Sequence, residues 1–564
     1  MKFLPSQLMY FLQSRETTKK IRSLMKFVLL LVVMIIAYSI AFHFLMEYED
    51  RRFSWLTGLY WTLTVMSTLG FGDITFTSDL GKLFSIFVLL SGVLFLLVML
   101  PFTFITFFYA PWLEAQSRFR APREVPEDFR DHVIFTSFDP LTISLVERLR
   151  HYQRPYVILT PDIQLSLELI DQGYNVVVGE LDDPEAYRCL RVQQAAMVIA
   201  NNDDMKNTNI TFTIRELTRE TPIVTNADLD ESIDILQLAG STHVYQFMKM
   251  LGRALARRAL GISPRANIIG RFNQLLIAEA AAMRTPLVGK TLLESGIRQA
   301  TGINVVGLWE QGRFETPRAA SRINPSTVLV LAGSEEQLAR YDDLMQGVGE
   351  LTAPILILGG GRVGQAAADA LKERGIAYRI IEKNPALIRH KEDYIQGSAA
   401  DLKTLVRAGI YETPSVFITT HTDDLNIYLT IYCRRLRPDI QIISRATLDR
   451  NISILHTAGA NLVVSAASLA ANTIFNLLIS NKVLMISEGL NIFRVKTHKS
   501  LAGKTLRKSR IREETGCTLI AVQTAEKMVL NPDPDKPLAP EDELILIGTG
   551  EAEKLFIARY PEKN

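Results

Sequence analysis

Two long apolar segments without formal charge constrain this chain more than any other feature. The first runs from residue 27 to 46, and the second, at about 82–110, begins just after Lys82. About 20 apolar residues match the hydrocarbon core of a bilayer, so each segment is long enough to cross a membrane as a helix. The second segment is longer than one perpendicular crossing requires, and Gly92 and Pro101 are natural positions for a bend. No small-residue cleavage site follows the first segment, which argues against a signal peptide.

Basic residues flank the outer ends of the two segments. They precede the first segment and follow the second: Arg15, Lys19, Lys20, Arg22, Lys26, Arg118, Arg120 and Arg123. The positive-inside rule therefore predicts a multi-pass inner-membrane protein whose N- and C-termini are both cytoplasmic. No additional span with regularly spaced arginines occurs, so the sequence predicts no voltage sensor.

The region between the two spans contains a third, shorter apolar stretch. Residues 55–67, WLTGLYWTLTVMS, are too few to cross a bilayer but apolar enough to enter it as a re-entrant pore helix. The next residues are Thr68-Leu69-Gly70-Phe71-Gly72-Asp73 (68–73). Glycines allow backbone conformations that turn successive carbonyl oxygens toward one axis. Four such loops would make a carbonyl cage for K+, whereas the plainer alternative is a two-span anchor with a glycine-rich external loop.

Residues 68–73 resemble the selectivity filter of potassium channels, whose usual form is Thr-Val-Gly-Tyr-Gly-Asp. Leu69 replaces the valine and Phe71 replaces the tyrosine. Both changes keep the backbone carbonyls and the Thr68 hydroxyl for K+, but Phe71 lacks a hydroxyl that braces the filter in that family. The resemblance also implies that Gly92 is the hinge of the inner helix, so Gly92 and Pro101 are the predicted gating hinge.

Charge and cysteine content limit the other functions that the chain could have. The formal net charge is only +2, so there is no basic excess to neutralise nucleic-acid phosphates. The three cysteines, Cys189, Cys433 and Cys517, lie far apart and match no metal-ligand spacing. They are interpreted as reduced thiols of a cytoplasmic region.

From Asp131 onward the chain alternates short apolar strands with helices, and it does so twice. The stretch HVIFTSFDPLTISLVERLR, which starts at His132, pairs with PILILGGGRVGQAAADALKERG, which starts at Pro354. The ends of the two copies also pair, through PLVGKTL and SLAGKTL. Such alternation predicts two parallel sheets covered by helices.

The two copies resemble RCK domains, which regulate potassium conductance. The resemblance implies a membrane α-helical pore domain followed by two tandem α/β Rossmann-like RCK domains, each with a smaller α+β C-terminal subdomain. It also implies a homotetramer in the lipid bilayer, in which eight RCK domains form a ring that pulls on the inner helices.

The predicted boundaries follow from these patterns. They are the cytoplasmic N-terminus 1–23, the pore domain 24–110, the linker 111–130, the first N-lobe 131–245, the first linking helices and C-lobe 246–348, the second N-lobe 349–467, and the second linking helices and C-lobe 468–564. The links at 246–287 and 468–488 are rich in helix formers and are predicted to contain few strands.

The second copy carries a dinucleotide-binding fingerprint. Gly359-x-Gly361-x-x-Gly364 follows the apolar strand 355–358 and opens a helix, and Glu382 closes the next strand. The glycines permit a tight turn, a close approach of backbone to a pyrophosphate, and close packing of helix on strand. Glu382 would accept hydrogen bonds from ribose hydroxyls and repel a 2′-phosphate, which favours NAD or an adenine nucleotide (ADP or ATP) over NADP.

Other candidate ligand residues of the second copy lie beside this fingerprint. Arg445, at the end of the fifth strand, is a candidate phosphate partner or, alternatively, part of a surface salt bridge. The remaining candidates lie at the helix start or at strand ends that face the same crevice: Arg362, Val363, Lys383, Gly397, Thr419 and Thr420.

The first copy has lost these features. Asp139 stands where the glycines would be and would repel phosphate, and Pro140 lacks an N–H donor. Thr160 replaces Glu382, and Asn226 replaces Arg445. The sequence therefore predicts nucleotide binding in the second copy only.

These features together predict a potassium-selective channel that is gated by a nucleotide, not an enzyme. Relatives with this layout include calcium-gated channels, so Ca2+ is a candidate second ligand. The metal-binding residues are unknown, because the acidic clusters at 182–185, 228–234 and 423–424 lack the spacing of an EF-hand loop. A membrane-tethered NAD-dependent oxidoreductase is an alternative, but no histidine lies in a recognisable catalytic arrangement. A component of a potassium uptake system is a second alternative, although such ring subunits normally lack a pore.

Overall fold

The structure is a computed structural model that describes most of the chain. The described residues are 15–109, 121–259, 266–272, 274–283, 285–310, 313–345, 353–389, 392–479, 483–485, 490–525 and 527–561. The chain divides into two compact units, one made of residues 1–123 with 161–178 and the other of residues 124–160 with 179–564. Part of the predicted linker 111–130 lies outside the described residues.

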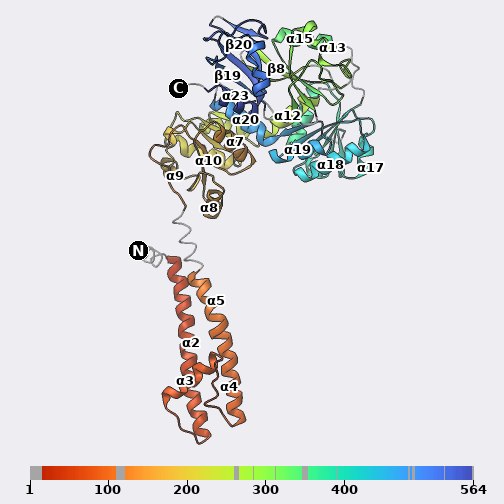
Figure 1. Ribbon diagram of the computed structural model, residues 1–564. Coiled ribbons are helices and arrows are strands. Elements are labelled where there is room, and N and C mark those ends of the chain that lie inside the picture. The colour runs from red at the N-terminus through yellow and green to blue at the C-terminus, as the bar shows by residue number, and fades with distance from the viewer. Residues whose placement is uncertain are drawn as a thin grey trace. The chain divides into compact units, whose positions relative to one another are not determined.

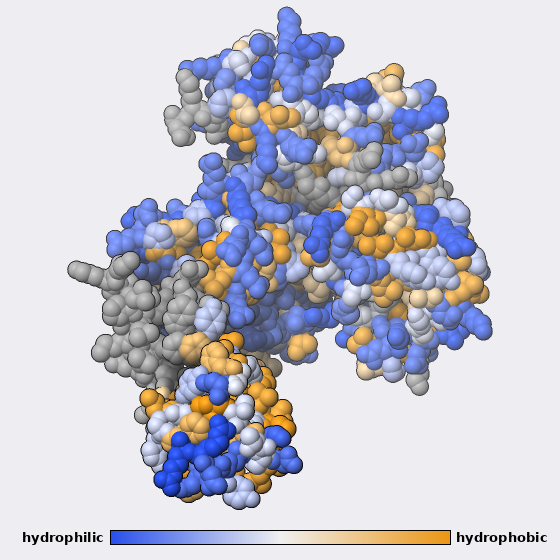
Figure 2. All heavy atoms as spheres, turned by 60° about the horizontal axis from the view of Figure 1, so that its bottom comes forward, coloured by the Kyte–Doolittle hydropathy of each residue, from blue (hydrophilic) through white to orange (hydrophobic). Residues whose placement is uncertain are grey.

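The first unit contains two long helical segments with a short helix between them (Figure 1). Their bounds are α2 Arg15–Tyr48, α3 Trp55–Met66, α4 Asp79–Gly92, η1 Val93–Met99, α5 Leu100–Phe104 and η2 Ile105–Tyr109. Met25–Tyr48 and Asp79–Phe104 are long and apolar enough to cross a membrane, and most of their side chains are exposed in the single chain. In Figure 2 apolar residues line the sides of this unit, and polar residues gather at the end that carries the loops between the spans.

The second long segment changes its hydrogen-bond register directly after Gly92. η1 and η2 are π-helical, and the N–H of Leu100 donates to the carbonyl of Phe95. Pro101 has no N–H, so a regular α-helical ladder cannot pass through it unbroken. π-Helical backbone thus begins directly after Gly92 and lies on both sides of the short α-helix that contains Pro101. Such stretches occur frequently at functional sites.

Gly92 also permits a very close contact between helices. A Cβ atom at this position would lie 2.4 Å from the Cα of Met66 and 2.5 Å from its carbonyl oxygen. The inner helix therefore touches the end of α3 backbone to backbone, beside a core that includes Trp61, Phe76 and Val88. Gly92 thus has a packing role that does not depend on any hinge.

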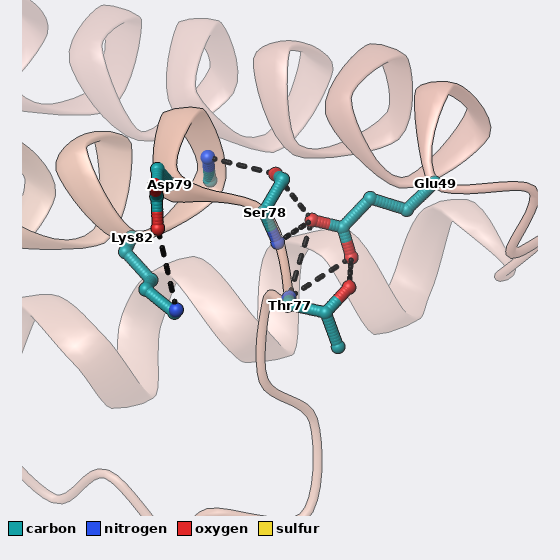
Figure 3. A network of polar contacts seen from close by, with 6 residues as sticks. Glu49, Thr77, Ser78, Asp79 and Lys82 are labelled. Atoms are coloured by element: carbon teal, nitrogen blue, oxygen red, sulfur yellow. Dashed lines mark hydrogen bonds and ion pairs between the residues drawn. The ribbon is translucent and has the colours of Figure 1, made fainter.

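Glu49, directly after α2, connects this helix to the start of α4 (Figure 3). Its Oε1 accepts hydrogen bonds from the N–H and hydroxyl of Ser78, at 2.8 and 2.5 Å. Its Oε2 accepts from the N–H and hydroxyl of Thr77, at 3.1 and 2.9 Å. The bonds from Ser78, followed by those from Thr77, lower the pKa of Glu49 to about 2. Because Ser78 also caps α4, Glu49 fixes the position at which the inner helix begins.

We expect Glu49→Gln to lower the unfolding temperature of the detergent-purified protein by several degrees at neutral pH. The folded-state pKa lies below the ordinary value, so the stabilisation is complete above about pH 4.5 and is lost as the pH falls toward 2. The difference in unfolding temperature between Glu49→Gln and the unsubstituted protein should therefore become smaller as the pH falls from about 4.5 toward 2. Asp79→Asn is the control, because within the described residues Asp79 forms an ion pair with the exposed Lys82, at 3.5 Å, and none with Thr77 or Ser78. Equal losses in both variants would contradict the assignment.

The chain from Val133 onward contains two parallel six-stranded sheets of the same topology. Their strand orders are β3-β2-β1-β4-β5-β6 and β14-β13-β12-β15-β16-β17. The strands are β1 Val133–Phe135, β2 Tyr156–Thr160, β3 Val176–Val178, β4 Met197–Ala200, β5 Ile223–Asn226, β6 His243–Tyr245, β12 Ile355–Leu358, β13 Tyr378–Glu382, β14 Tyr394–Gln396, β15 Ser415–Ile418, β16 Gln441–Ala446 and β17 Leu462–Ser465. The order reverses between β1 and β4 and between β12 and β15, and sheets of this kind bind ligands outside the carboxyl ends at such a point.

Helices connect the strands of each parallel sheet. In the first copy they are α7 Pro140–His151, α8 Ile163–Asp171, α9 Pro184–Cys189, η3 Val192–Gln194, α10 Asp204–Arg215 and α11 Ser232–Ala239. In the second copy they are α16 Arg362–Lys372, η5 Pro385–Leu387, α17 Leu402–Ala408, α18 Asp423–Leu436, η6 Asp449–Asn451 and α19 Ile452–Thr457. The predicted Rossmann-like architecture of both copies is confirmed.

Each copy continues into a smaller antiparallel sheet. The strand orders are β10-β9-β11-β8-β7 and β18-β19-β22-β20-β21. The first C-lobe contains β7 Asn267–Phe272, β8 Leu275–Ala281, α13 Leu292–Ser295, α14 Ile297–Thr301, β9 Asn304–Glu310, β10 Arg313–Glu315, β11 Val328–Gly333 and α15 Glu335–Leu344. The second contains β18 Val483–Met485, β19 Leu490–Lys496, α21 Leu506–Ser509, α22 Ile511–Thr515, β20 Thr518–Gln523, β21 Met528–Leu530, β22 Glu543–Thr549 and α23 Gly550–Arg559.

The expectation of a helical link with few strands over 246–287 is wrong in its second half. α12 Phe247–Ala259 is the helix, but β7 and β8 follow it within the same range. The sequence of β8, LLIAEAA, consists of helix-forming residues, yet all seven are buried in the antiparallel sheet. Burial between neighbouring strands overrides the local preference here. The second link likewise contains a helix, α20 Ala466–Leu478, before β18.

The linking helices cross between the copies. α12 of the first copy packs against α16 of the second, and α20 of the second packs against α7 of the first. The first contact is tight, because a Cβ atom on Gly252 would lie 2.5 Å from the carbonyl oxygen of Val363. The second contact is polar, and Arg148 of α7 donates to Asn472 at 2.8 Å and Ser468 at 3.1 Å.

We expect Gly252→Ala to destabilise the second unit, although helix propensity alone predicts a gain of about 1 kcal/mol. Overpacking against the backbone of Val363 costs about 1–3 kcal/mol, and a backbone atom cannot move aside as a flexible side chain can. Thermal unfolding of the full chain measures the sign of the change. Gly550→Ala is the matched control, because its Cβ would meet nothing nearer than Asn491, at 4.0 Å. A stabilised Gly252→Ala variant would refute the close contact.

Candidate nucleotide site and filter loop

The three fingerprint glycines form a tight turn between β12 and α16. Gly359 has a φ of +110°, a left-handed conformation that favours glycine. A Cβ atom on Gly364 would lie 1.9 Å from the carbonyl oxygen of Gly359, so only glycine fits this contact of helix and strand. Gly361 is the N-cap of α16 and supplies no capping side chain, which leaves the helix N-terminus open to an anion.

Glu382 holds this turn from the end of β13. Its Oε2 accepts a hydrogen bond from the N–H of Gly360 at 2.6 Å, and its Oε1 accepts from the N–H of Asn384 at 2.7 Å. The side chain is only 9% exposed. Each carboxylate oxygen keeps a second lone pair that can accept a ribose hydroxyl. The sequence analysis missed the contact with Gly360, for which the run of three glycines at 359–361 was the available signal.

Arg445 lies in β16 with a side chain that is 5% exposed. Its Nη2 donates to the hydroxyl of Thr447 at 3.1 Å, but its buried Nε has no hydrogen-bond partner within the described parts of the chain. Burial lowers the pKa of Arg445, Asp423 raises it, and the positive charge of Arg362 lowers it. The alternative of a surface salt bridge does not fit so buried a side chain. A buried guanidinium with an unsatisfied N–H is suited to receive an anion.

Two further predicted residues, Thr419 and Thr420, form hydrogen bonds within the chain. The hydroxyl of Thr419 donates to the carbonyls of Leu358 and Gly359, at 3.1 and 2.8 Å, so it supports the turn. Thr420 donates to the side chain of Asn426 at 2.6 Å.

Four more residues were predicted to lie at the crevice. Val363 is buried behind the turn, and Lys383 is exposed. Gly397 has a φ of +158° and packs closely on Thr404. Arg362, the first residue of α16, forms an ion pair with Asp228 of the first copy.

The equivalent turn of the first copy is closed by its own carboxylate. Asp139 caps α7 and accepts from the N–H of Thr142 at 2.9 Å, and its second oxygen accepts from Ser137 at 2.9 Å and Asn201 at 2.7 Å. A carboxylate thus occupies the helix N-terminus where a phosphate would bind. The side chain of Asn226 is also engaged, because its Oδ1 accepts from the N–H of Phe247 at 3.2 Å.

The acidic clusters serve the local structure of the chain. Asp183 caps α9, Asp230 accepts from Gln246 and Lys249, and Asp423 accepts from the N–H groups of Thr447 and Leu448. Within the described ranges, no group of three or more His, Cys, Asp or Glu side chains is placed to hold a metal ion. The single chain therefore assigns no residues to Ca2+.

The loop after α3 has an alternating backbone conformation. Thr68, Gly70 and Gly72 have φ values of +62°, +46° and +76°, whereas the intervening Leu69 and Phe71 are not left-handed. Such alternation turns successive peptide planes so that their carbonyl oxygens lie on one side, which is the arrangement that coordinates K+ in channel filters.

Two aromatic residues of α3 brace this loop. The hydroxyl of Tyr60 donates to Oδ2 of Asp73 at 3.2 Å, and the Nε1–H of Trp61 donates to the carbonyl of Ile74 at 3.1 Å. The ring of Tyr60 also stacks on Phe71, with the centroids 6.4 Å apart. The sequence analysis identified the hydroxyl missing at Phe71 but not these bonds from the pore helix.

Comparisons with known families agree with this division of the chain. Residues 29–109 match the Ion channel family. Residues 133–246 and 355–466 each match the TrkA-N domain, and residues 280–346 and 490–559 each match the TrkA-C domain.

Individual relatives are potassium channels. Probable potassium channel protein 2 of Methanocaldococcus jannaschii is 26% identical over 243 residues, which are 39% of this chain and 71% of that protein. The solved structure of the GsuK channel is 37% identical, with a TM-score of 0.58, and covers 96% of this chain and 99% of that one. The GsuK channel bound to NAD is 38% identical over the same shares, with a TM-score of 0.57. The chain therefore belongs to the family of potassium channels that carry tandem RCK domains, to which GsuK also belongs.

Proposed function

We propose that this potassium channel is gated by NAD or an adenine nucleotide that binds at the turn of residues 359–364. The observation that carries the proposal is the buried Nε of Arg445, which has no partner among the described residues. Arg445 is near enough to Arg362 for the two charges to interact, and Arg362 opens a helix whose N-terminus has no capping side chain. A pyrophosphate would satisfy both groups at once. Glu382 would then receive the ribose hydroxyls. The NAD bound to the related GsuK channel supports this assignment.

The packing of α16 offers a route by which an occupied site could act on the rest of the ring. The first turn of α16 contacts α12 through Gly252 and Val363, so a shift of α16 cannot leave α12 unchanged. α12 is in turn joined to the first C-lobe by the buried ion pair of Arg258 and Glu279, at 3.1 Å. A ligand can shift a conformational equilibrium only through a difference in affinity between its states.

The pore requires several copies of the chain. One loop of residues 68–73 supplies one side of a carbonyl cage, so we propose a homotetramer whose eight RCK domains form a cytoplasmic ring. Gly92 and Pro101 are the proposed hinge, and the segment 111–130 would transmit the pull of the ring. Single-channel recording determines whether the nucleotide opens or closes the pore. It also determines whether Ca2+ adds to the effect of the nucleotide.

The test is single-channel recording of the purified protein in a bilayer, with asymmetric KCl and NaCl and with NAD titrated on the ring side. We expect a reversal potential near that of K+ and an open probability that changes with NAD. Glu382→Ala should raise the NAD concentration that gives half of the response by about 10- to 100-fold, as expected for the loss of hydrogen bonds to a charged group. Thr160→Ala is the matched control in the first copy.

The possible results separate the two halves of the proposal. A K+ current indifferent to NAD, ADP and ATP would keep the pore and exclude the nucleotide site. A current that does not discriminate K+ from Na+ would contradict the role of the loop 68–73. An equal shift in Thr160→Ala would show that the effect of Glu382→Ala is not specific to the second copy.

Thermal unfolding tests Arg445 independently of gating. A ligand that binds only the folded state stabilises it by about 2.7 kcal/mol at 100 times its dissociation constant, so NAD should raise the unfolding temperature. We expect Arg445→Gln to lose most of this rise, because the phosphates lose a buried charged partner. An undiminished rise in Arg445→Gln would remove Arg445 from the site.

A further inference from the structure

An ion pair joins the two copies at the mouth of the nucleotide crevice. Nη1 of Arg362, the first residue of α16, contacts Oδ1 of Asp228, which follows β5 of the first copy. The side chains of Arg362 and Asp228 are 52% and 38% exposed, so a ligand from solution can reach the pair. A carboxylate of one copy therefore lies at the helix N-terminus that would bind phosphate in the other.

The first copy holds Asp228 firmly in this position. The N–H of Asp228 donates to Oδ1 of Asp204 at 2.7 Å, and the N–H of Leu229 donates to Oδ2 of Asp204 at 3.1 Å. The side chain of Asn226 donates to Oδ1 of Asp228 at 3.2 Å. Because the loop fixes the carboxylate, the mobile member of the pair is the long side chain of Arg362.

The second copy builds the same loop without the acid. The N–H groups of Thr447 and Leu448 donate to the two carboxylate oxygens of Asp423, at 2.8 and 3.1 Å, as those of Asp228 and Leu229 do to Asp204. Thr447 thus stands at the position of Asp228. A carboxylate at this loop position reaches the second crevice only because the copies pack together.

The charges at the crevice show what this carboxylate does. Arg362 is close enough to lower the pKa of Arg445, so the empty crevice holds two neighbouring positive charges. Asp228 neutralises the outer one. A phosphate that binds at the start of α16 would attract Arg362 and be repelled by Asp228, so the two anions compete for one guanidinium.

We infer that Asp228 is a built-in competitor for the phosphates of the nucleotide. It holds Arg362 while the crevice is empty, and the pyrophosphate of a dinucleotide or nucleoside diphosphate takes Arg362 over when it binds. Binding thereby releases a contact between the two copies, which links occupancy of the crevice to the arrangement of the ring. This inference rests on the proposed nucleotide site and adds a residue of the first copy to it.

The strength of the pair suits an exchange of partners. Ion pairs between partly exposed side chains are weak, so a ligand present in excess can displace one reversibly. An ion pair that exists only in the empty state stabilises that state, and it weakens nucleotide binding by the same free energy. Removing the competitor should therefore tighten nucleotide binding by about two- to fivefold.

The test is calorimetric titration of the full-length protein in detergent with NAD. We expect Asp228→Asn, which is nearly isosteric, to bind NAD about two- to fivefold more tightly than the unsubstituted protein. The difference in NAD affinity between Asp228→Asn and the unsubstituted protein should become smaller as the KCl concentration is raised, because salt screens an exposed ion pair. In an Arg362→Gln background, Asp228→Asn should have a smaller effect, because only the direct repulsion of the phosphate by Asp228 remains, and the difference between the two effects isolates the pairwise interaction. Asp230→Asn is the control on the same loop, because Asp230 contacts Gln246 and Lys249 instead.

The results distinguish this inference from the proposed function. Equal NAD affinity in Asp228→Asn and the unsubstituted protein, or weaker binding in Asp228→Asn, would overturn the inference and keep the nucleotide site. An effect of Asp228→Asn that is undiminished in the Arg362→Gln background would also overturn it. No binding of NAD or ADP by the unsubstituted protein would overturn the nucleotide site and the inference together.

Discussion

The contact of α12 with α16 is the packing on which the second unit most depends. At Gly252 the helix of one copy meets the backbone of Val363 and the small side chain of Ala366 in the other. This contact places the first turn of α16 against the first copy, and the same turn begins the nucleotide crevice. Because the contact lies directly behind the crevice, the ligand site and the interface between the copies share one helix turn.

The two copies share one fold but differ in the N-cap of the helix that follows their first strand. In the first copy the carboxylate of Asp139 satisfies the start of α7, so the helix is stable without a ligand. In the second copy Gly361 supplies no capping side chain at the start of α16, and the Nε of Arg445 has no partner in the described part of the chain. The proposed site therefore contains unsatisfied donors, which lower its stability until an anion binds. The duplicated domain thus separates a copy whose helix start is capped from a copy whose proposed site is open to a ligand.

The pore unit uses close contacts in a similar way. Gly92 lets the inner helix approach the end of the pore helix, and the helix departs from α geometry directly after this contact. Glu49 sets the other end of the same helix through Thr77 and Ser78. The inner helix is therefore fixed at its start and at Gly92, and its irregular part lies beyond both contacts.

Several elements could be predicted because their signals are local in the sequence. The apolar spans, the helix before the filter loop, the repeated strand–helix pattern and the glycine turn each depend on neighbouring residues, and the described chain contains each of these elements. The strand β8 could not be predicted, because its leucines and alanines favour a helix until neighbouring strands bury them. The bonds of Tyr60 and Trp61 to the filter loop were also missed, since they depend on how α3 lies against that loop.

The sequence by itself determined the class of the protein, because membrane spans, filter and fingerprint are contiguous patterns with a direct physical reading. Only the tertiary structure decided which charges meet. The pairing of Arg362 with Asp228 joins residues of different copies, and no spacing along the chain encodes it. The Nε of Arg445 is buried without a partner among the described residues, and this likewise depends on every element packed around it. Local patterns specify elements, whereas the electrostatics of a site arise from groups that folding brings together from distant parts of the chain.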